Sequence, residues 1–381
     1  MGNERIALSL PHMGGNEQKY VDKAIETNWV VPLGPDVQGF EKDLERFFGE
    51  KKTVVALSSG TAAIHLALVQ LGVGYGDEVI CQSFTFAASA NPIVYLGAKP
   101  VFVDSEADTW NMSPLLLEEA IKDRIAQTGK KPKAIIPVFL YGMPAKMDEI
   151  MAVANRYEIP VIEDAAEALG SSFKGQMCGT FGTFAALSFN GNKIITTSGG
   201  GALVCPTEED AKRTMFFATQ ARDNAPHYQH TQIGYNYRMS NICAAIGRGQ
   251  MEVLSERVQR RREINRLYRD GLKAIDSISF QTAPSPDYFS NYWLTSILVD
   301  PTQTNGVTRE TIRLACEKIH IETRPLWKPM HLQPVFADCP FYGDGTSERL
   351  FDNGLCLPSG SILTDDQIQR VIKYVISILS K

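Results

Sequence analysis

The sequence lacks the cysteine and histidine patterns that mark metal centres or disulfide frameworks. Its 7 cysteines are an odd number among 381 residues, and no two are spaced as Cys-x-x-Cys. The 6 histidines form no His-Glu-x-x-His motif. We therefore expect no metal site, and the scattered cysteines favour a reducing, cytoplasmic location.

Long apolar runs and an excess of basic residues are also missing. No stretch of about 18 apolar residues occurs, and no apolar run follows a basic segment near the first residue. The sequence thus predicts neither a membrane span nor a signal peptide. With 38 Lys and Arg against 43 Asp and Glu, the net charge of −5 disfavours a nucleic-acid partner. A small anionic ligand remains open, because a few local cations and backbone amides suffice to bind one.

Short apolar segments alternate with helical patterns in the first half of the chain. Strands are expected at residues 54–57, 78–81, 100–103, 134–138 and 160–163. Helices are expected at residues 61–71, 87–96, 115–126 and 147–157. This order predicts an α/β fold with a mostly parallel central sheet, whose strands are apolar on both faces because helices flank both sides.

The pattern changes in the second half. Helices are expected at 206–222 and 239–273, and short strands mixed with helices follow from about residue 277. Thr364 and Gln367 form a capping box that predicts a final helix. Two domains are therefore expected. They are residues 1–250, with an N-terminal arm and a large α/β domain, and residues 251–381, with a long linking helix and a small α+β domain.

Two motifs fall at the carboxyl ends of expected strands, where ligands bind in open α/β sheets. The segment Leu57-Ser-Ser-Gly-Thr-Ala62 offers free helix N-terminal amides to a phosphate, although it is also typical of a routine helix cap. Glu163, Asp164 and Glu167 follow another strand. An acid in that position either caps a helix or pairs with a protonated ring nitrogen.

A third motif runs from Ser188 to Leu203 and carries Lys193 between two apolar runs, followed by three glycines. A lysine in water-poor surroundings is a candidate Schiff-base nucleophile, and an exposed loop lysine is the alternative. The glycines predict room for a ligand that approaches the backbone closely. A phosphate loop, a strand-end aspartate and a later lysine together indicate pyridoxal phosphate (PLP), which needs one of each.

The order of these motifs resembles the DegT/DnrJ-type family of sugar aminotransferases, which have the aspartate-aminotransferase-like fold (PLP fold type I). The resemblance extends over nearly the whole chain. The matching motifs are Ser58-Ser-Gly-Thr-Ala-Ala63, Phe84-Thr-Phe-Ala-Ala-Ser89, Glu163-Asp-Ala-Ala-Glu-Ala-Leu-Gly170, Ser188-Phe189 with Lys193, and Gly234-Tyr-Asn-Tyr-Arg-Met239. The resemblance implies a large PLP-binding α/β domain and a smaller C-terminal α+β domain.

The resemblance also implies roles for single residues. Lys193 is expected to bind PLP covalently and to move the proton, and Asp164 to pair with the pyridinium nitrogen. Phe86 is expected to stack on the ring, with a core phenylalanine as the alternative. The residues expected at the phosphate are Gly60, Thr61 and Ser188. Some relatives carry histidine in place of this lysine and act as dehydratases, so Lys193 favours transamination.

Two positions raise further expectations from the same resemblance. Glu167 lies where relatives often carry His or Gln near the cofactor's 3-hydroxyl, and the glutamate leaves its role there open. Asn236 matches a phosphate ligand that relatives donate from the neighbouring subunit. A homodimer with shared active sites is therefore expected.

Residues 11–17 with 28–34, and residues 324–331, are similar to bacillosamine-pathway enzymes. Those enzymes aminate a UDP-linked 4-keto-6-deoxy-N-acetylhexosamine, and the resemblance implies L-glutamate as the amino donor. Tryptophan rings suit the uracil or sugar face, and basic side chains suit the diphosphate. The residues expected to contact the substrate are Trp29, Arg238, Arg324, Trp327, Lys328 and His331. A surface or interface contact is the alternative for each of them.

Two other functions remain open at this point. One is amination of a dTDP- or GDP-linked 3- or 4-ketosugar. The other is a regulatory protein that binds PLP without turnover. Lys193 and Asp164 disfavour the regulatory protein, because binding alone needs neither a proton shuttle nor an electron sink.

Overall fold

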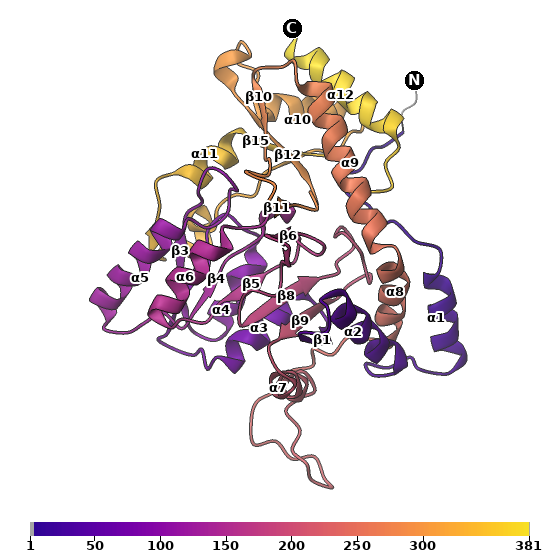
Figure 1. The fold of residues 1–381 in the computed structure, drawn as a ribbon, viewed down its shortest axis with the longest axis vertical. Coiled ribbons are helices and arrows are strands. Elements are labelled where there is room, and N and C mark those ends of the chain that lie inside the picture. Colours follow the sequence, from indigo (N-terminus) through magenta and orange to yellow (C-terminus); the bar gives the residue numbers. More distant parts are fainter. Residues whose placement is uncertain (1–3, 381) are drawn as a thin grey trace.

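The computed structural model describes residues 4–380. Bridges from Ile135 to Val161 and from Val138 to Asp164 join two four-stranded sheets into one central sheet. This sheet lies in the lower half of Figure 1, with C-terminal elements above it. The strand order is β1 (Thr53–Leu57), β9 (Gly201–Cys205), β8 (Phe184–Ser188), β5 (Ile162–Asp164), β4 (Ala134–Ile136), β2 (Glu78–Gln82), β3 (Lys99–Val103) and β14 (Phe341–Tyr342).

The central sheet is mostly parallel. Among its described strands, only β9 is antiparallel to its neighbours, β1 and β8, and all the other neighbouring strands pair in parallel. Strands such as β1 and β9 are buried almost throughout, as their unbroken apolar runs predict. The predicted α/β class is therefore confirmed.

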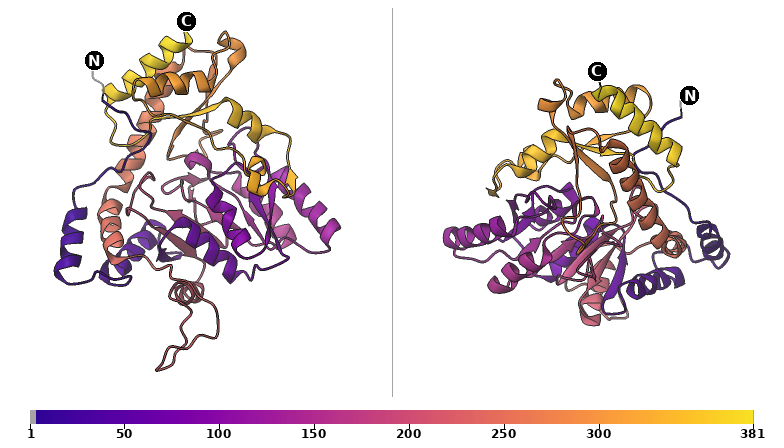
Figure 2. Two further views of the ribbon diagram at one scale, coloured as in Figure 1. Left: turned by 180° about the vertical axis from the view of Figure 1, so that it is seen from behind. Right: turned by 45° about the horizontal axis from the view of Figure 1, so that its top comes forward.

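Helices cover both faces of this sheet (Figure 2). Because successive strand residues point to opposite faces, Val54 and Ala56 belong to one core cluster, and Val55 and Leu57 belong to another. The first cluster includes residues of α2 (Pro35–Phe47), α5 (Pro114–Thr128) and α6 (Met147–Tyr157). The second includes residues of α3 (Gly60–Gln70), α4 (Asn91–Tyr95) and α7 (Glu208–Ala218).

Two predicted helices are interrupted. The helix expected at 87–96 is a 3₁₀ turn at Ala87–Ser89 followed by α4, because Pro92 lacks an amide proton and fits only the first turn of a helix. The helix expected at 239–273 is two helices, α8 (Asn241–Glu252) and α9 (Leu254–Leu272). They meet at Val253, whose dihedral angles (φ −112°, ψ 6°) are not helical.

A second sheet is antiparallel and lies toward the C-terminus. Its order is β10 (Ile278–Phe280), β12 (Thr295–Val299), β15 (Gly354–Leu357) and β13 (Arg324–Pro325). A third core cluster joins it to α9, α10 (Arg309–Lys318) and α12 (Asp365–Leu379). The predicted capping box begins α12, with reciprocal hydrogen bonds between Thr364 and Gln367. The domain boundary at 250/251 stays a prediction, since this cluster also contains Ile6 of the N-terminal arm.

The remaining elements are α1 (Glu17–Glu26), α11 (Thr346–Asn353), and a small sheet of β11 (Tyr288–Phe289), β6 (Ser172–Phe173) and β7 (Gln176–Met177). The middle of the segment between α7 and α8 extends away from the body at the bottom of Figure 1 and exposes Tyr228 and Ile233. Within residues 4–380, no helix is both long and apolar enough to cross a membrane.

Candidate active site

A cavity of about 820 Å³ lies at the carboxyl ends of β1, β5 and β8, and residues of the C-terminal sheet form its other wall. Most of the residues predicted for the site line this cavity, although they come from distant parts of the chain. They are Gly60, Thr61, Phe86, Asp164, Glu167, Ser188, Lys193, Arg324, Trp327 and Lys328.

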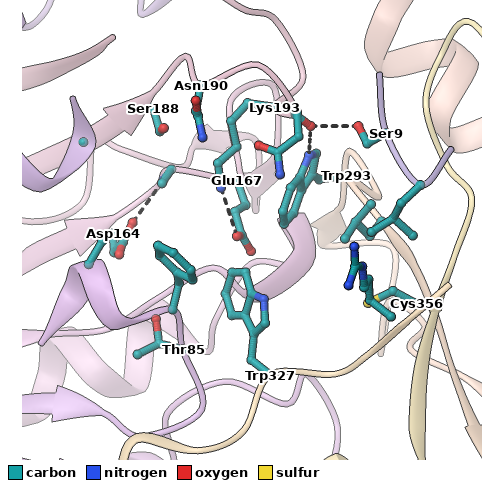
Figure 3. A pocket seen from close by; sticks show the side chains of 18 of the residues that line it. Ser9, Thr85, Asp164, Glu167, Ser188, Asn190, Lys193, Trp293, Trp327 and Cys356 are labelled. Atoms are coloured by element: carbon teal, nitrogen blue, oxygen red, sulfur yellow. Dashed lines mark hydrogen bonds and ion pairs between the residues drawn. The ribbon is translucent and has the colours of Figure 1, made fainter. Parts of the chain in front are cut away.

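Lys193 lies in the connection between β8 and β9, and its side chain points toward Glu167 (Figure 3). Its Nζ donates a hydrogen bond to Glu167 Oε1 at 3.1 Å and lies 4.1 Å from the centre of the Trp293 ring. The side chain is 12% exposed. Lys193 is thus an enclosed amine between a carboxylate and an indole face, not an exposed loop lysine.

Contacts from distant segments hold the turn that carries Lys193. The Asn192 carbonyl accepts hydrogen bonds from Ser9 Oγ at 2.8 Å and from Trp293 Nε1 at 2.7 Å. The Lys193 carbonyl accepts one from the Arg261 guanidinium at 3.3 Å. Burial lowers the pKa of Arg261 to about 9, so the guanidinium stays charged at neutral pH. The N-terminal arm, α9 and the segment before β12 together fix where Nζ lies.

Glu167 is 3% exposed and uses both carboxylate oxygens. Oε1 accepts from Lys193, and Oε2 accepts from the backbone amide of Tyr141 at 2.7 Å. Burial raises the pKa of Glu167 to about 7, although the Lys193 charge opposes this rise. Tyr141 has a φ of +54°, a conformation that costs a non-glycine residue about 1–3 kcal/mol. The hydrogen bond from its amide to Glu167 helps to hold that conformation.

The neighbouring carboxylates Glu163 and Asp164 leave β5 on opposite faces, as successive strand residues do. Asp164 lines the cavity and accepts from Ser89 Oγ at 2.5 Å, and burial raises its pKa. Glu163 accepts from the amides of Gly179 at 2.7 Å and Gly182 at 2.6 Å, and burial raises its pKa to about 7. Asp164 is therefore the acid that faces the cavity, and Glu163 binds a loop behind it.

The N-terminus of α3 opens onto the cavity. Ser59 caps the helix, its Oγ accepting from the Ala62 amide at 3.0 Å. The amides of Gly60 and Thr61 have no acceptor within the part of the chain that the structure describes. Free amides and the partial positive charge of a helix N-terminus suit an anion such as a phosphate.

Of the three glycines after Lys193, Gly199 and Gly200 line the cavity, and room there for a ligand stays a prediction. Packing within the protein supplies a second reason for glycine at two of the positions. A Cβ on Gly201 would lie 2.3 Å from Gly60 N, and a Cβ on Gly200 would lie 2.3 Å from Thr197 Oγ1. Only Gly199 of the three has open space around it. The packing of the protein against itself, chiefly β9 against the start of α3, therefore requires the last two glycines.

Aromatic rings line part of the cavity. Phe86 is 58% exposed, so it is not a core residue, and its ring centre lies 5.5 Å from that of Trp327. Trp327 lies 5.2 Å from Tyr141, measured between ring centres. Arg324 and Lys328 are exposed at the same wall, and Arg324 donates to Glu322 at 2.9 Å. Apolar faces and cations thus lie side by side.

Four predicted residues lie outside this cavity. Arg238 donates to Glu41 at 2.5 Å and to the Ala56 carbonyl at 2.9 Å. His331 Nδ1 lies 2.7 Å from Ser83 Oγ, and its Nε2 lies 3.2 Å from Glu348 Oε1. Both side chains thus have partners within the chain, and their contact with the substrate stays a prediction. Trp29 and Asn236 are exposed elsewhere on the surface.

Residues that the sequence did not single out also shape the site. Trp293, Tyr141 and Arg261 hold Lys193 and Glu167 in place, as the contacts above show. Tyr141 follows shortly after β4, a strand-end position that was a usable signal. Trp293 and Arg261 carry no such signal, because only tertiary packing brings them to the lysine.

A family model described as the DegT/DnrJ/EryC1/StrS aminotransferase family matches residues 11–376. That match covers nearly the whole sequence and includes every residue that lines the cavity from Ser58 onward. The chain belongs to the DegT/DnrJ/EryC1/StrS family. It is a PLP-dependent sugar aminotransferase, as the resemblance predicted.

Relatives and a solved structure agree with this family. The chain is 50% identical to EpsN of Bacillus subtilis (strain 168) over 383 residues, covering 99% of this chain and 96% of EpsN. It is 39% identical to GDP-perosamine synthase of Escherichia coli O157:H7 over 373 residues, 97% of each chain. It is 34% identical to the UDP-4-amino-4-deoxy-L-arabinose–oxoglutarate aminotransferase of Shewanella sediminis (strain HAW-EB3), covering 89% and 87%.

Among solved structures, the PLP form of Spr1654 from Streptococcus pneumoniae superposes with a TM-score of 0.89 at 27% identity, covering 99% of both chains. The chain therefore has PLP fold type I, as the sequence predicted, and PLP is its cofactor.

Proposed function

We propose that this sugar aminotransferase transfers an amino group from L-glutamate to a nucleotide-linked 4-keto-6-deoxy-N-acetylhexosamine, with UDP as the nucleotide. The observation that carries the proposal is the convergence on one cavity of an enclosed lysine, a buried aspartate and a helix N-terminus. Aromatic rings and two exposed cations line the same cavity, which suits a sugar linked to a nucleoside diphosphate.

The cavity fits PLP on its own chemistry. The free amides of Gly60 and Thr61, with Ser188 beside them, suit the phosphate. Asp164 is the acid for the ring nitrogen, and the exposed face of Phe86 suits the ring. Lys193 supplies the amine. PLP contributes an electron sink that stabilises negative charge on the carbon from which a proton is removed.

In the proposed reaction Lys193 has two tasks. Its Nζ binds the cofactor, and once released it takes a proton from the amino donor as a base and returns it as an acid. Asp164 would pair with the ring nitrogen and favour its protonated form. The amides at the start of α3 hold the phosphate, so the reacting atoms keep their alignment. Phe86 and Trp327 present their rings on the same side of the cavity.

The nucleotide is the finer part of the proposal. Segments similar to bacillosamine-pathway enzymes favour UDP, and one relative is named for a UDP-linked amino sugar and for oxoglutarate, the keto acid formed from glutamate. GDP is the second candidate, because the chain is 39% identical to a GDP-perosamine synthase. Both candidates place the new amine on a nucleotide-linked sugar.

We also propose a homodimer in which Asn236 completes the partner's site. Asn236 does not line the cavity of its own chain, and it is exposed beside Thr219, where the segment that extends from the body returns to α7. The exposed Tyr228 and Ile233 on that segment suit burial against a second copy. Coexpressed Lys193→Ala and Asn236→Ala chains should recover activity that neither variant has alone. No recovery would overturn the shared site.

The experiment for the activity uses purified protein with PLP, L-glutamate and a panel of UDP-, GDP- and dTDP-linked 4-ketosugars. Mass spectrometry follows the amino sugar. The UDP-linked N-acetyl sugar should give the highest kcat/KM, and faster turnover of a GDP sugar would favour the second candidate. No product from any sugar would overturn the enzymatic proposal, and normal turnover by Lys193→Ala would overturn the mechanism.

A further inference from the structure

Two buried carboxylates, Glu163 and Glu167, lie four residues apart, and only Glu167 touches Lys193. We propose that Glu167 is the base that takes a proton from the Lys193 ammonium, which leaves Nζ uncharged and able to bond to the cofactor. This inference rests on the proposed function, in which Lys193 binds PLP covalently.

The geometry around Glu167 leaves one oxygen for this task. Its Oε2 accepts from the Tyr141 amide at 2.7 Å, while Oε1 lies 3.1 Å from Lys193 Nζ. No arginine forms an ion pair with Glu167 among residues 4–380, and Lys193 is its cationic partner. The indole face of Trp293, 4.1 Å from Nζ, covers the lysine on another side. The enclosed pair therefore offers the proton a direct path from nitrogen to oxygen.

The surrounding groups favour a proton acceptor near neutral pH. Burial raises the pKa of Glu167 to about 7, and the nearby Asp164 carboxylate raises it further, while Lys193 and the Tyr141 amide lower it. The Cys356 thiol of β15 also faces Glu167, and burial raises the pKa of that thiol to about 12, so it stays uncharged. The Tyr141 hydroxyl stays uncharged too, because burial raises its pKa.

The proton balance is simple. One N–H bond of Lys193 breaks and one O–H bond forms on Glu167 Oε1, so the ion pair becomes a neutral amine beside a neutral acid. The net charge of the pair is zero before and after the step, which avoids a buried unpaired charge. The neutral amine is then the nucleophile toward the cofactor's carbonyl carbon.

A purely structural role for Glu167 would be to hold the Tyr141 amide. Glutamine keeps that role, because its side-chain carbonyl can accept the same hydrogen bond, but it cannot take a proton. Glu167→Gln therefore separates the two roles. Glu163→Gln is the matched control, since it also neutralises a buried carboxylate on β5 but has no contact with Lys193.

The experiment follows covalent PLP incorporation into apoprotein, so it does not depend on turnover. Samples are reduced with borohydride at timed intervals between pH 6 and 9, and mass spectrometry quantifies the labelled Lys193 peptide. In wild-type protein the rate should rise with pH and level off above about 7, where Glu167 is ionised. Glu167→Gln should react about 100-fold more slowly at pH 7.5, a typical loss for a missing general base.

Glu163→Gln should react at the wild-type rate. Acetate added to Glu167→Ala should restore part of the rate, because a free carboxylate can occupy the space and accept the proton. Acetamide, whose oxygen can accept from the Tyr141 amide but cannot take a proton, should not restore it. A wild-type rate of PLP incorporation in Glu167→Gln would overturn this inference but not the proposed function. The same would follow if Glu163→Gln were slowed as much as Glu167→Gln. Absence of label on Lys193 in wild-type protein would overturn the proposed function as well.

Discussion

Replacing Gly201 with alanine should force β9 and the start of α3 apart. The added Cβ would lie 2.3 Å from Gly60 N, 2.3 Å from the Ser59 carbonyl carbon and 2.6 Å from its oxygen, whereas real Cβ atoms essentially never approach within 3.0 Å. Gly201 pairs with both Leu57 and Ser188, so β9 cannot shift without losing ladder hydrogen bonds. The clash is between two backbones, and no flexible side chain can relieve it.

The magnitude follows from this geometry. Overpacking a well-packed site costs about 1–3 kcal/mol, and a clash between backbones belongs at the upper end, so we expect a loss of about 3 kcal/mol of unfolding free energy. The Gly60 and Thr61 amides would move with the start of α3. Losing one hydrogen bond to a charged phosphate costs about 1.5–3 kcal/mol, which weakens PLP binding by about 10- to 100-fold.

The assay is urea unfolding of the apoprotein together with PLP titration, both at one fixed protein concentration. Gly199→Ala is the matched control for stability, because a Cβ there meets no atom within 4 Å. Its unfolding free energy should stay within about 0.5 kcal/mol of the wild type. If Gly201→Ala also stayed within that margin and bound PLP normally, the close contact between β9 and α3 would be refuted.

Three other substitutions test the surroundings of the site. Trp293→Phe keeps a ring beside Lys193 but loses the 2.7 Å hydrogen bond from the indole to the Asn192 carbonyl. Because that bond helps to position Lys193, kcat should fall about tenfold. An unchanged kcat would contradict a positioning role for Trp293. Arg238→Met should lower the unfolding free energy by about 1–3 kcal/mol, because Glu41 loses its partner. The KM for the nucleotide sugar should stay within about twofold of the wild-type value. A large rise in KM would show that Arg238 contacts the substrate. Because burial raises the pKa of Glu163 from 4.5 to about 7, the stability that it contributes is present below pH 4.5 and is lost as pH rises through 7, about 3 kcal/mol in all. Between pH 5 and pH 8, urea unfolding of the wild-type protein should show about 2.5 kcal/mol of this loss. Glu163→Gln should lack that part of the loss, and identical pH dependence in the two proteins would refute the assignment.

Sequence alone predicted the features that depend on local pattern. Short apolar segments alternate with segments of helical periodicity, and this alternation predicted a mostly parallel sheet covered by helices. Strands that helices cover on both faces are apolar at every position, which is why the segments show no polar alternation. The order of motifs predicted the family and PLP. It also predicted Lys193, Asp164, Gly60, Thr61 and Ser188 as a group, and they meet because carboxyl ends of parallel strands share one edge.

Features that depend on long-range packing were not predictable in this way. The strand pattern by itself could not separate Glu163 from Asp164 as the cavity acid, and only the family resemblance selected Asp164. The direction of each side chain depends on which face of β5 meets which neighbour. It also carried no sign of the ion pair between Arg238 and Glu41, which lie 197 positions apart in the chain.

The Ser188–Leu203 stretch shows the same division. Its pattern identified a lysine followed by glycines, and that much is local. Only the tertiary structure decided that Glu167 accepts from Nζ, that Trp293 lies beside it, and that Gly201 is required by α3. Hydrogen bonds and steric contacts between residues far apart in the chain act over a few ångströms of space, and a linear pattern does not record those distances.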